Sequence, residues 1–128
     1  MLAALSRELD VPLQPRRIRV GEVRVEVDGA DEDLSVLVEA WAHQGSPKPA
    51  QRNKVLTDAL KLVWVASTLL ARPRLVLCLS DPAAARPFTG SRSWPAAALR
   101  GLDVEVRVVD LPPEVRAVVL HAQHRQYR

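Results

Sequence analysis

The sequence predicts an α/β protein of three layers, in which a mixed sheet of four to five strands carries helices on both faces. In the first half of the chain, short strand-like segments follow one another directly, which favours antiparallel pairing. In the second half, strand-like and helix-like segments alternate, which is typical of parallel strands joined by helical crossovers. At 128 residues the chain suits one domain, residues 1–128, with its own core.

The charge of the chain is weakly basic overall and uneven along its length. Lysine and arginine number 18 against 15 aspartates and glutamates, which permits nucleic-acid binding without arguing strongly for it. Six of the 15 acidic residues fall between Glu22 and Asp33, so the rest of the chain is distinctly basic.

The sequence disfavours several classes of protein. The single cysteine, Cys78, lies in an apolar run and excludes a disulfide framework or a cysteine zinc cluster. The apolar stretch of residues 63–71 is interrupted by Ser67 and Thr68, so no segment is predicted to span a membrane. Because residues 1–5 are followed at once by Ser6-Arg7-Glu8, we expect no signal peptide and a cytoplasmic location.

Residues 2–9 are predicted to form a short helix, because three leucines recur at spacings of three and four. The next segment alternates apolar and charged residues across Gly21-Glu22, which indicates either a hairpin with a type II′ turn or one long strand with a bulge. Residues 28–31, Asp-Gly-Ala-Asp, are predicted to be a turn. The more apolar residues 35–43 are expected to form a strand deeper in the sheet.

The clearest predicted element is a helix over residues 50–71. Its apolar residues form a wide face, while Gln51, Lys54, Asp58 and Lys61 line the opposite side. The remaining predicted elements are a buried strand over 74–79, helices that begin at Asp81-Pro82 and at Ser93-Trp94-Pro95, a strand over 104–109 and a final helix from 112 to about 126.

Two carboxylates are candidates for chemistry. Asp28 ends its predicted strand before Gly29, and an Asp-Gly pair is equally typical of an ordinary turn. Glu39 lies in the middle of an apolar strand, on the same face as Leu37 and Trp41. A carboxylate in that position needs a partner or a metal ion, so Glu39 is harder to explain as a solvated residue.

The start of the following helix offers a cation and an amide. Gln51 and Lys54 lie one turn apart on the same side of that helix, whose N-terminus itself attracts phosphate. Magnesium binds through one or two carboxylates, water and substrate phosphate, so Asp28 and Glu39 suit a Mg²⁺ or Mn²⁺ site beside this lysine. The alternative is a solvated helix face on which Lys54 and Asp58 form a weak surface pair.

These residues resemble the PD-(D/E)xK restriction-endonuclease-like superfamily. Its core is a helix, a three-strand meander, a helix and another strand, which matches residues 2–80 and leaves residues 81–126 as an extension. In that family an Asp at the end of one strand and an acidic residue on the next bind the metal, and a lysine follows two residues later. Asp28 in Val-Asp-Gly and Glu39 in Val-Glu-Ala-Trp fit the acidic positions, whereas Trp41 stands at the lysine position.

The resemblance offers a replacement for that lysine. Some members of the superfamily carry the lysine on the following helix, as Lys54 would, and others carry a glutamine there, which Gln51 resembles. It implies that Asp28 and Glu39 hold Mg²⁺ or Mn²⁺, that Lys54 assists the attacking water or the phosphate, and that Gln51 orients the site. His43 is expected to be an accessory residue on the side of Glu39 if the strand continues that far.

The expected function is that of a metal-dependent nuclease, which hydrolyses phosphodiester bonds. The alternative is a non-catalytic module with a decayed site that binds nucleic acid or protein, which the tryptophan in the lysine position favours. Nucleic acid is the expected partner and no membrane partner is expected. A second copy of the chain is a further expected partner, because so small a protein would need one to engage a duplex symmetrically.

Overall fold

The computed structural model describes residues 1–90 and 92–126. In this part of the chain the elements are α1 (Leu2–Leu9), β1 (Gln14–Val20), β2 (Val23–Ala30), β3 (Val36–Trp41), α2 (Pro49–Ser67), β4 (Arg74–Leu79), α3 (Pro82–Thr89), α4 (Trp94–Gly101), β5 (Val104–Val108) and α5 (Pro113–Gln126). The predicted helix starts are confirmed, since the side chains of Asp81 and Ser93 cap α3 and α4.

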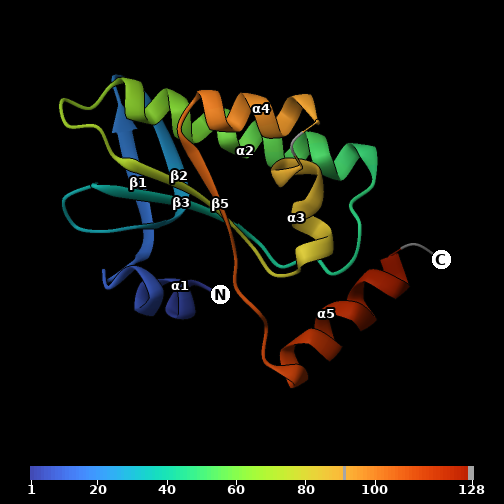
Figure 1. Ribbon diagram of the computed structural model, residues 1–128. Coiled ribbons are helices and arrows are strands. Elements are labelled where there is room, and N and C mark those ends of the chain that lie inside the picture. The colour runs from blue at the N-terminus through green and yellow to red at the C-terminus, as the bar shows by residue number, and fades with distance from the viewer. Residues whose placement is uncertain (91, 127–128) are drawn as a thin grey trace.

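The five strands form one mixed sheet in the order β1-β2-β3-β4-β5. β1, β2 and β3 pair antiparallel as a meander, and β4 and β5 continue the sheet in parallel with β3. Figure 1 shows α2, α3 and α4 together on one face of the sheet and α1 on the other. The predicted α/β class, with a mixed sheet and helices on both faces, is confirmed.

The sheet separates two hydrophobic clusters. The larger lies between the sheet and helices α2 to α4 and includes Leu37 and Leu62, whereas the smaller lies under α1 and includes Leu5 and Val38. Since successive side chains of a strand point to opposite faces, Glu39 shares the face of Leu37. The carboxylate of Glu39 therefore points from β3 toward the α2 side.

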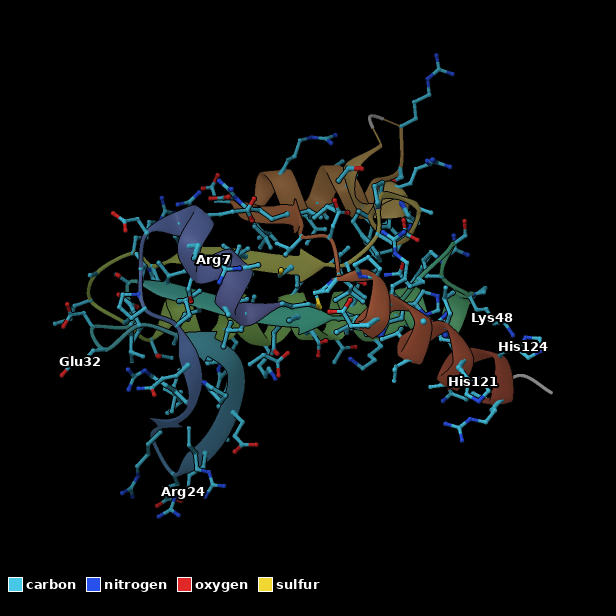
Figure 2. The ribbon with its side chains drawn as sticks, turned by 90° about the horizontal axis from the view of Figure 1, so that it is seen from below. Arg7, Arg24, Glu32, Lys48, His121 and His124 are labelled. Atoms are coloured by element: carbon cyan, nitrogen blue, oxygen red, sulfur yellow. The ribbon has the colours of Figure 1, made fainter. Side chains whose placement is uncertain are left out.

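The hairpin between β1 and β2 is confirmed. Val20 pairs with Val23, which leaves a two-residue loop, and Gly21 has a φ of +60° whereas Glu22 is not among the residues of positive φ. This is the combination that a type II′ turn requires. Figure 2 shows the end of this hairpin, marked by Arg24, projecting away from the helices.

The predicted turn at residues 28–31 is wrong, because β2 continues to Ala30. The turn follows it, and the carboxylate of Asp31 accepts hydrogen bonds from the backbone N–H groups of Ser35 (2.7 Å) and Val36 (2.9 Å). Burial acts to raise the pKa of Asp31, but these hydrogen bonds and that of the Ser35 hydroxyl outweigh it, so the pKa is lowered. Asp31 is therefore occupied in holding the turn before β3.

An irregularity in β2 changes which residues face α2. The pairing advances from Gln14 to Arg16 on β1 but from Val27 to Ala30 on β2, so β2 contains one extra residue, as in a β-bulge. Val27 and Ala30 both belong to the cluster under α2, although simple alternation would place them on opposite faces. Beyond the bulge, Asp28 falls on the same face as Ala30.

Two predicted boundaries were too generous. α2 ends at Ser67 rather than at residue 71, and Leu60 and Leu70, which helical spacing places on the predicted apolar face, are exposed. Helical spacing defines a wide apolar face, but the sheet and its neighbouring helices cover only part of it. β3 ends at Trp41, so His43 lies in the loop that follows the strand.

α5 lies apart from the core and contains no buried residue. Its attachment to the loop after β3 is reciprocal: Gln44 N donates to Gln123 Oε1 (2.8 Å) and Gln123 Nε2 donates to Gln44 O (2.9 Å). His121 and His124 are exposed on this helix (Figure 2). Among the helices that the structure describes, none is long and apolar enough to cross a membrane.

Candidate functional site

The structure brings Asp28 and Glu39 together. Gly29 pairs with Val38 across β2 and β3, which places Asp28 opposite Glu39, and the bulge turns Asp28 toward the same face. The Oδ2 atom of Asp28 also accepts a hydrogen bond of 2.8 Å from the N–H of Ala40. Asp28 is exposed, whereas Glu39 is only 4% exposed. The pair therefore has one carboxylate open to solvent and one buried behind it.

The environment of Glu39 disfavours its charged form. Burial is the largest effect and raises its pKa, and the hydrogen bond and negative charge of Asp28 raise it further. Lys61 acts in the opposite direction, but the net pKa is about 8. Near neutral pH the buried Glu39 is therefore largely in its protonated, neutral form.

The cation that reaches Glu39 is Lys61 of α2, which forms an ion pair with Glu39 Oε1. This buried oxygen accepts no hydrogen bond of regular geometry within the described residues. We did not predict a role for Lys61, although its position two turns after Lys54 puts it on the same side of the helix. That spacing was the available signal, and only the docking of α2 on the sheet selects Lys61.

Lys54 and Gln51 make different contacts. Lys54 Nζ pairs with Asp58 at 3.2 Å, and the side chain of Lys54 is 57% exposed. Gln51 Oε1 accepts a hydrogen bond of 2.8 Å from the N–H of Lys48, as part of a capping box at the start of α2. The two side chains predicted to act on substrate are thus engaged along α2 itself, whereas the lysine that reaches Glu39 is Lys61.

A cavity of about 460 Å³ lies beside the end of β3 and includes Gln51 and Lys54 in its wall, together with residues of α5. Trp41 and His43 also line it, and their rings stack with centroids 4.3 Å apart and an interplanar angle of 8°. Burial lowers the pKa of His43 despite its hydrogen bond with Ser46 and the charge of Asp81. His43 is therefore a largely buried, neutral imidazole at neutral pH.

The donor set of the carboxylate pair suits a hard divalent cation. Magnesium is commonly held by one or two carboxylates, with water and substrate phosphate as the other ligands. Asp28 and Glu39 supply two adjacent carboxylates, although Glu39 Oε1 is in contact with Lys61, which a bound cation would displace or adjoin. Residues 1–90 and 92–126 contain no group of three or more His, Cys, Asp or Glu that would enclose a metal by protein ligands alone.

The thiol of Cys78 takes no part in this site. It is fully buried in the cluster under α1, and burial raises its pKa to about 11.

Comparisons with protein-family models, curated proteins and solved structures give no match.

Proposed function

We propose that the protein is a metal-dependent nuclease in which Asp28 and Glu39 bind Mg²⁺ or Mn²⁺ and Lys61 supplies the lysine of the site. The observation that carries this proposal is the buried Glu39, held between a second carboxylate and a lysine from another element. A buried carboxyl with a pKa of about 8 is costly to keep in the absence of a function, and such groups concentrate at active sites.

The chain order supports the restriction-endonuclease-like part of the proposal. From Leu2 to Leu79 the elements are a helix, a three-strand antiparallel meander, a helix and a strand, the order that the resemblance implies. The two acidic positions lie on β2 and β3, the second and third strands of that meander.

Each residue of the site has a defined task. A Mg²⁺ ion bound there would lower the pKa of a bound water and offset the charge that develops on the phosphate. Glu39 would release its proton to solvent on binding the ion, and exposed Asp28 would give the ion access from solvent. The Nζ of Lys61 lies beside Glu39, where it adds positive charge next to a bound phosphate.

Lys61 takes the role that the resemblance gives to a lysine at position 41. Position 41 is a tryptophan that stacks on His43, and Lys54 pairs with Asp58. Neither position 41 nor position 54 therefore provides a lysine at Glu39. We therefore assign Lys54 and Gln51, which line the neighbouring cavity, to contacts with the nucleic-acid backbone rather than to the reacting phosphate.

The test is cleavage of labelled single-stranded and double-stranded DNA and RNA with Mg²⁺ or Mn²⁺. We expect Asp28→Asn and Glu39→Gln each to lower the cleavage rate about 100-fold or more, since these changes remove a ligand charge but keep the side-chain shape. Glu26→Gln is the matched control, because Glu26 is an exposed carboxylate of β2 that pairs with Arg17. Equal cleavage by all four proteins would assign the activity to a contaminant or to another site.

A second candidate function is a non-catalytic nucleic-acid-binding module. It is favoured by the 4% exposure of Glu39 and by the stacked Trp41 in the lysine position. Under this alternative Mn²⁺ does not raise the melting temperature of the protein and no nucleic acid is cleaved. Salt-sensitive binding of nucleic acid would still be observed.

A further inference from the structure

A second cavity, of about 640 Å³, lies where the N-terminal parts of α2 and α4 meet α3. Figure 1 shows these three helices converging at one end of the molecule. Arg52 comes from α2, Arg86 from α3, and Arg92 from the segment before α4. The wall contains no acidic residue among the residues that the structure describes there. Three separate elements thus direct positive charge to one hollow.

Several basic side chains of the sheet are neutralised by carboxylates. Arg17 pairs with Glu26, and Arg74 donates hydrogen bonds to Glu105, which Arg107 also contacts. By contrast, within residues 1–90 and 92–126 the guanidinium groups of the three cavity arginines have no recorded ion pair. Unmatched, exposed positive charge around a cavity attracts polyanions.

Trp94 adds a stacking surface to the same cavity. It is the first residue of α4 and is 72% exposed, although the chain has only three tryptophans. Its backbone is well held, because Ser93 Oγ accepts a hydrogen bond from Ala96 N (3.1 Å) and donates one to Pro87 O (2.7 Å). An indole that is fixed at its base and open on its face suits stacking against a planar ligand group.

We infer that this cavity binds a single-stranded segment of nucleic acid, with phosphates against Arg52, Arg86 and Arg92 and a base stacked on Trp94. Single strands expose the faces of their bases, whereas a duplex covers them within its own stack, so Trp94 selects unpaired substrate. The inference names the substrate class of the proposed nuclease and takes its biological meaning from that function. Binding itself is independent of the carboxylate pair and is measured without metal.

The experiment measures fluorescence anisotropy of a labelled oligodeoxythymidylate and its RNA counterpart with the full chain in EDTA, where metal-dependent cleavage is suppressed. We expect both single strands to bind at least about tenfold more tightly than a duplex of the same length. Inorganic phosphate and a free nucleoside monophosphate serve as competitors, and we expect each to compete only at far higher concentration than the unlabelled oligonucleotide.

Four variants locate the binding site. Trp94→Ala should weaken binding about tenfold, and Trp94→Phe should retain most of the affinity because the ring can still stack. Arg86→Ala should weaken binding severalfold and reduce the slope of log affinity against log salt by about 0.7. Arg7→Ala is the matched control, since Arg7 is exposed on α1 across the sheet (Figure 2) and should bind within about twofold of wild type.

Three results would overturn the inference: Trp94→Ala binding as tightly as wild type, equal affinity for duplex and single strand, or competition by nucleoside monophosphate at oligonucleotide concentrations. Failure of the nuclease proposal is distinguishable from these. If the wild-type protein shows no Mn²⁺-dependent cleavage but the Trp94 and Arg86 variants still bind single strands more weakly, the nuclease proposal fails and the single-strand site stands. If the wild-type protein cleaves nucleic acid but Trp94→Ala binds single strands as tightly as wild type, only the single-strand site is overturned.

Discussion

The two polar regions beside α2 handle charge in opposite ways. At the carboxylate pair, the ionisable group is buried and has a partner, since Glu39 is 4% exposed and its Oε1 contacts Lys61. In the arginine cavity, charge is exposed and without acidic partners among the described residues. Arg52 lies about half a helical turn from Lys54, so the two regions occupy different sides of one helix.

This contrast teaches how one helix can serve two tasks. A buried pair of carboxylates beside one cation suits a small ion in a fixed place. Exposed arginines around a tryptophan suit an extended, flexible polyanion. We therefore assign reaction chemistry to the first region and recognition to the second, and each of the following changes affects one side of that comparison.

The largest effect is expected from Lys61→Met, which removes the cation beside Glu39. We expect the rate of metal-dependent cleavage to fall about 100-fold, because a fixed positive charge next to a reacting phosphate contributes a factor of this size. Lys54→Met is the matched control and should lower the rate much less. A greater loss in Lys54→Met would return the catalytic lysine to the start of α2.

The second effect is a dependence of stability on pH. Folded Glu39 keeps its proton up to a pH of about 8, above its ordinary pKa of 4.5, so its contribution to stability is complete below pH 4.5 and is lost as the pH rises through about 8. Urea denaturation should show wild type losing up to about 1.4 kcal/mol per pH unit in this window relative to Glu39→Gln.

The comparison with Glu39→Gln separates the contribution of the Glu39 carboxyl to the pH dependence of stability from that of His43. The lowered pKa of His43 makes stability rise with pH, which is the opposite direction. The two proteins should differ little near pH 4 and most near pH 8, with Glu39→Gln the more stable at the higher pH. Parallel stability curves for the two proteins would show that Glu39 ionises normally and is not desolvated.

The third expectation is that a change in one region leaves the binding property of the other region unaltered. Glu39→Gln should bind single strands in EDTA within about twofold of wild type, whereas Trp94→Ala should keep the full rise in melting temperature with Mn²⁺. This independence is expected because, among the described residues, no residue of the carboxylate pair or Lys61 lines the arginine cavity. A loss of metal stabilisation in Trp94→Ala would mean that the two regions form one site.

The smallest effect is expected at the exposed pair of Lys54 and Asp58, whose Nζ–Oδ2 distance is 3.2 Å. Lys54→Ala should change the free energy of unfolding by less than about 0.5 kcal/mol, because solvent screens a pair of this kind. Chemical denaturation at low and high salt measures it. A change of several kcal/mol would reveal a buried role for Lys54 like that of Lys61.

Much of the fold follows from local patterns. Alternating valines across Gly21 predicted the first hairpin, and Asp81 and Ser93 predicted the starts of α3 and α4, because capping and turn preferences act within a few residues. Where the prediction of residues 28–31 was wrong, a strong turn pair was overridden by strand pairing. Gly29 there gives room for Leu2, since a Cβ at this position would lie 2.4 Å from its Cδ1.

The candidate site was only half visible in the sequence. Glu39 stood out because a carboxylate in an apolar strand conflicts with its surroundings, a conflict that any reader of the chain can detect. Lys61 did not stand out, because it is one of several polar residues along the same side of its helix. The arginine cavity was not predicted, since Arg52, Arg86 and Arg92 come from three different segments of the chain and are ordinary in type.

The sequence by itself determined the elements, the α/β class and the residue that has to be explained, Glu39. These follow from periodicity, capping and the cost of burying charge, which depend on neighbours in the chain. The tertiary structure alone decided that a bulge turns Asp28 toward Glu39, that Lys61 rather than Lys54 reaches it, and that three arginines surround Trp94. Strand register and helix docking set such contacts, and both are fixed by packing between segments distant in sequence.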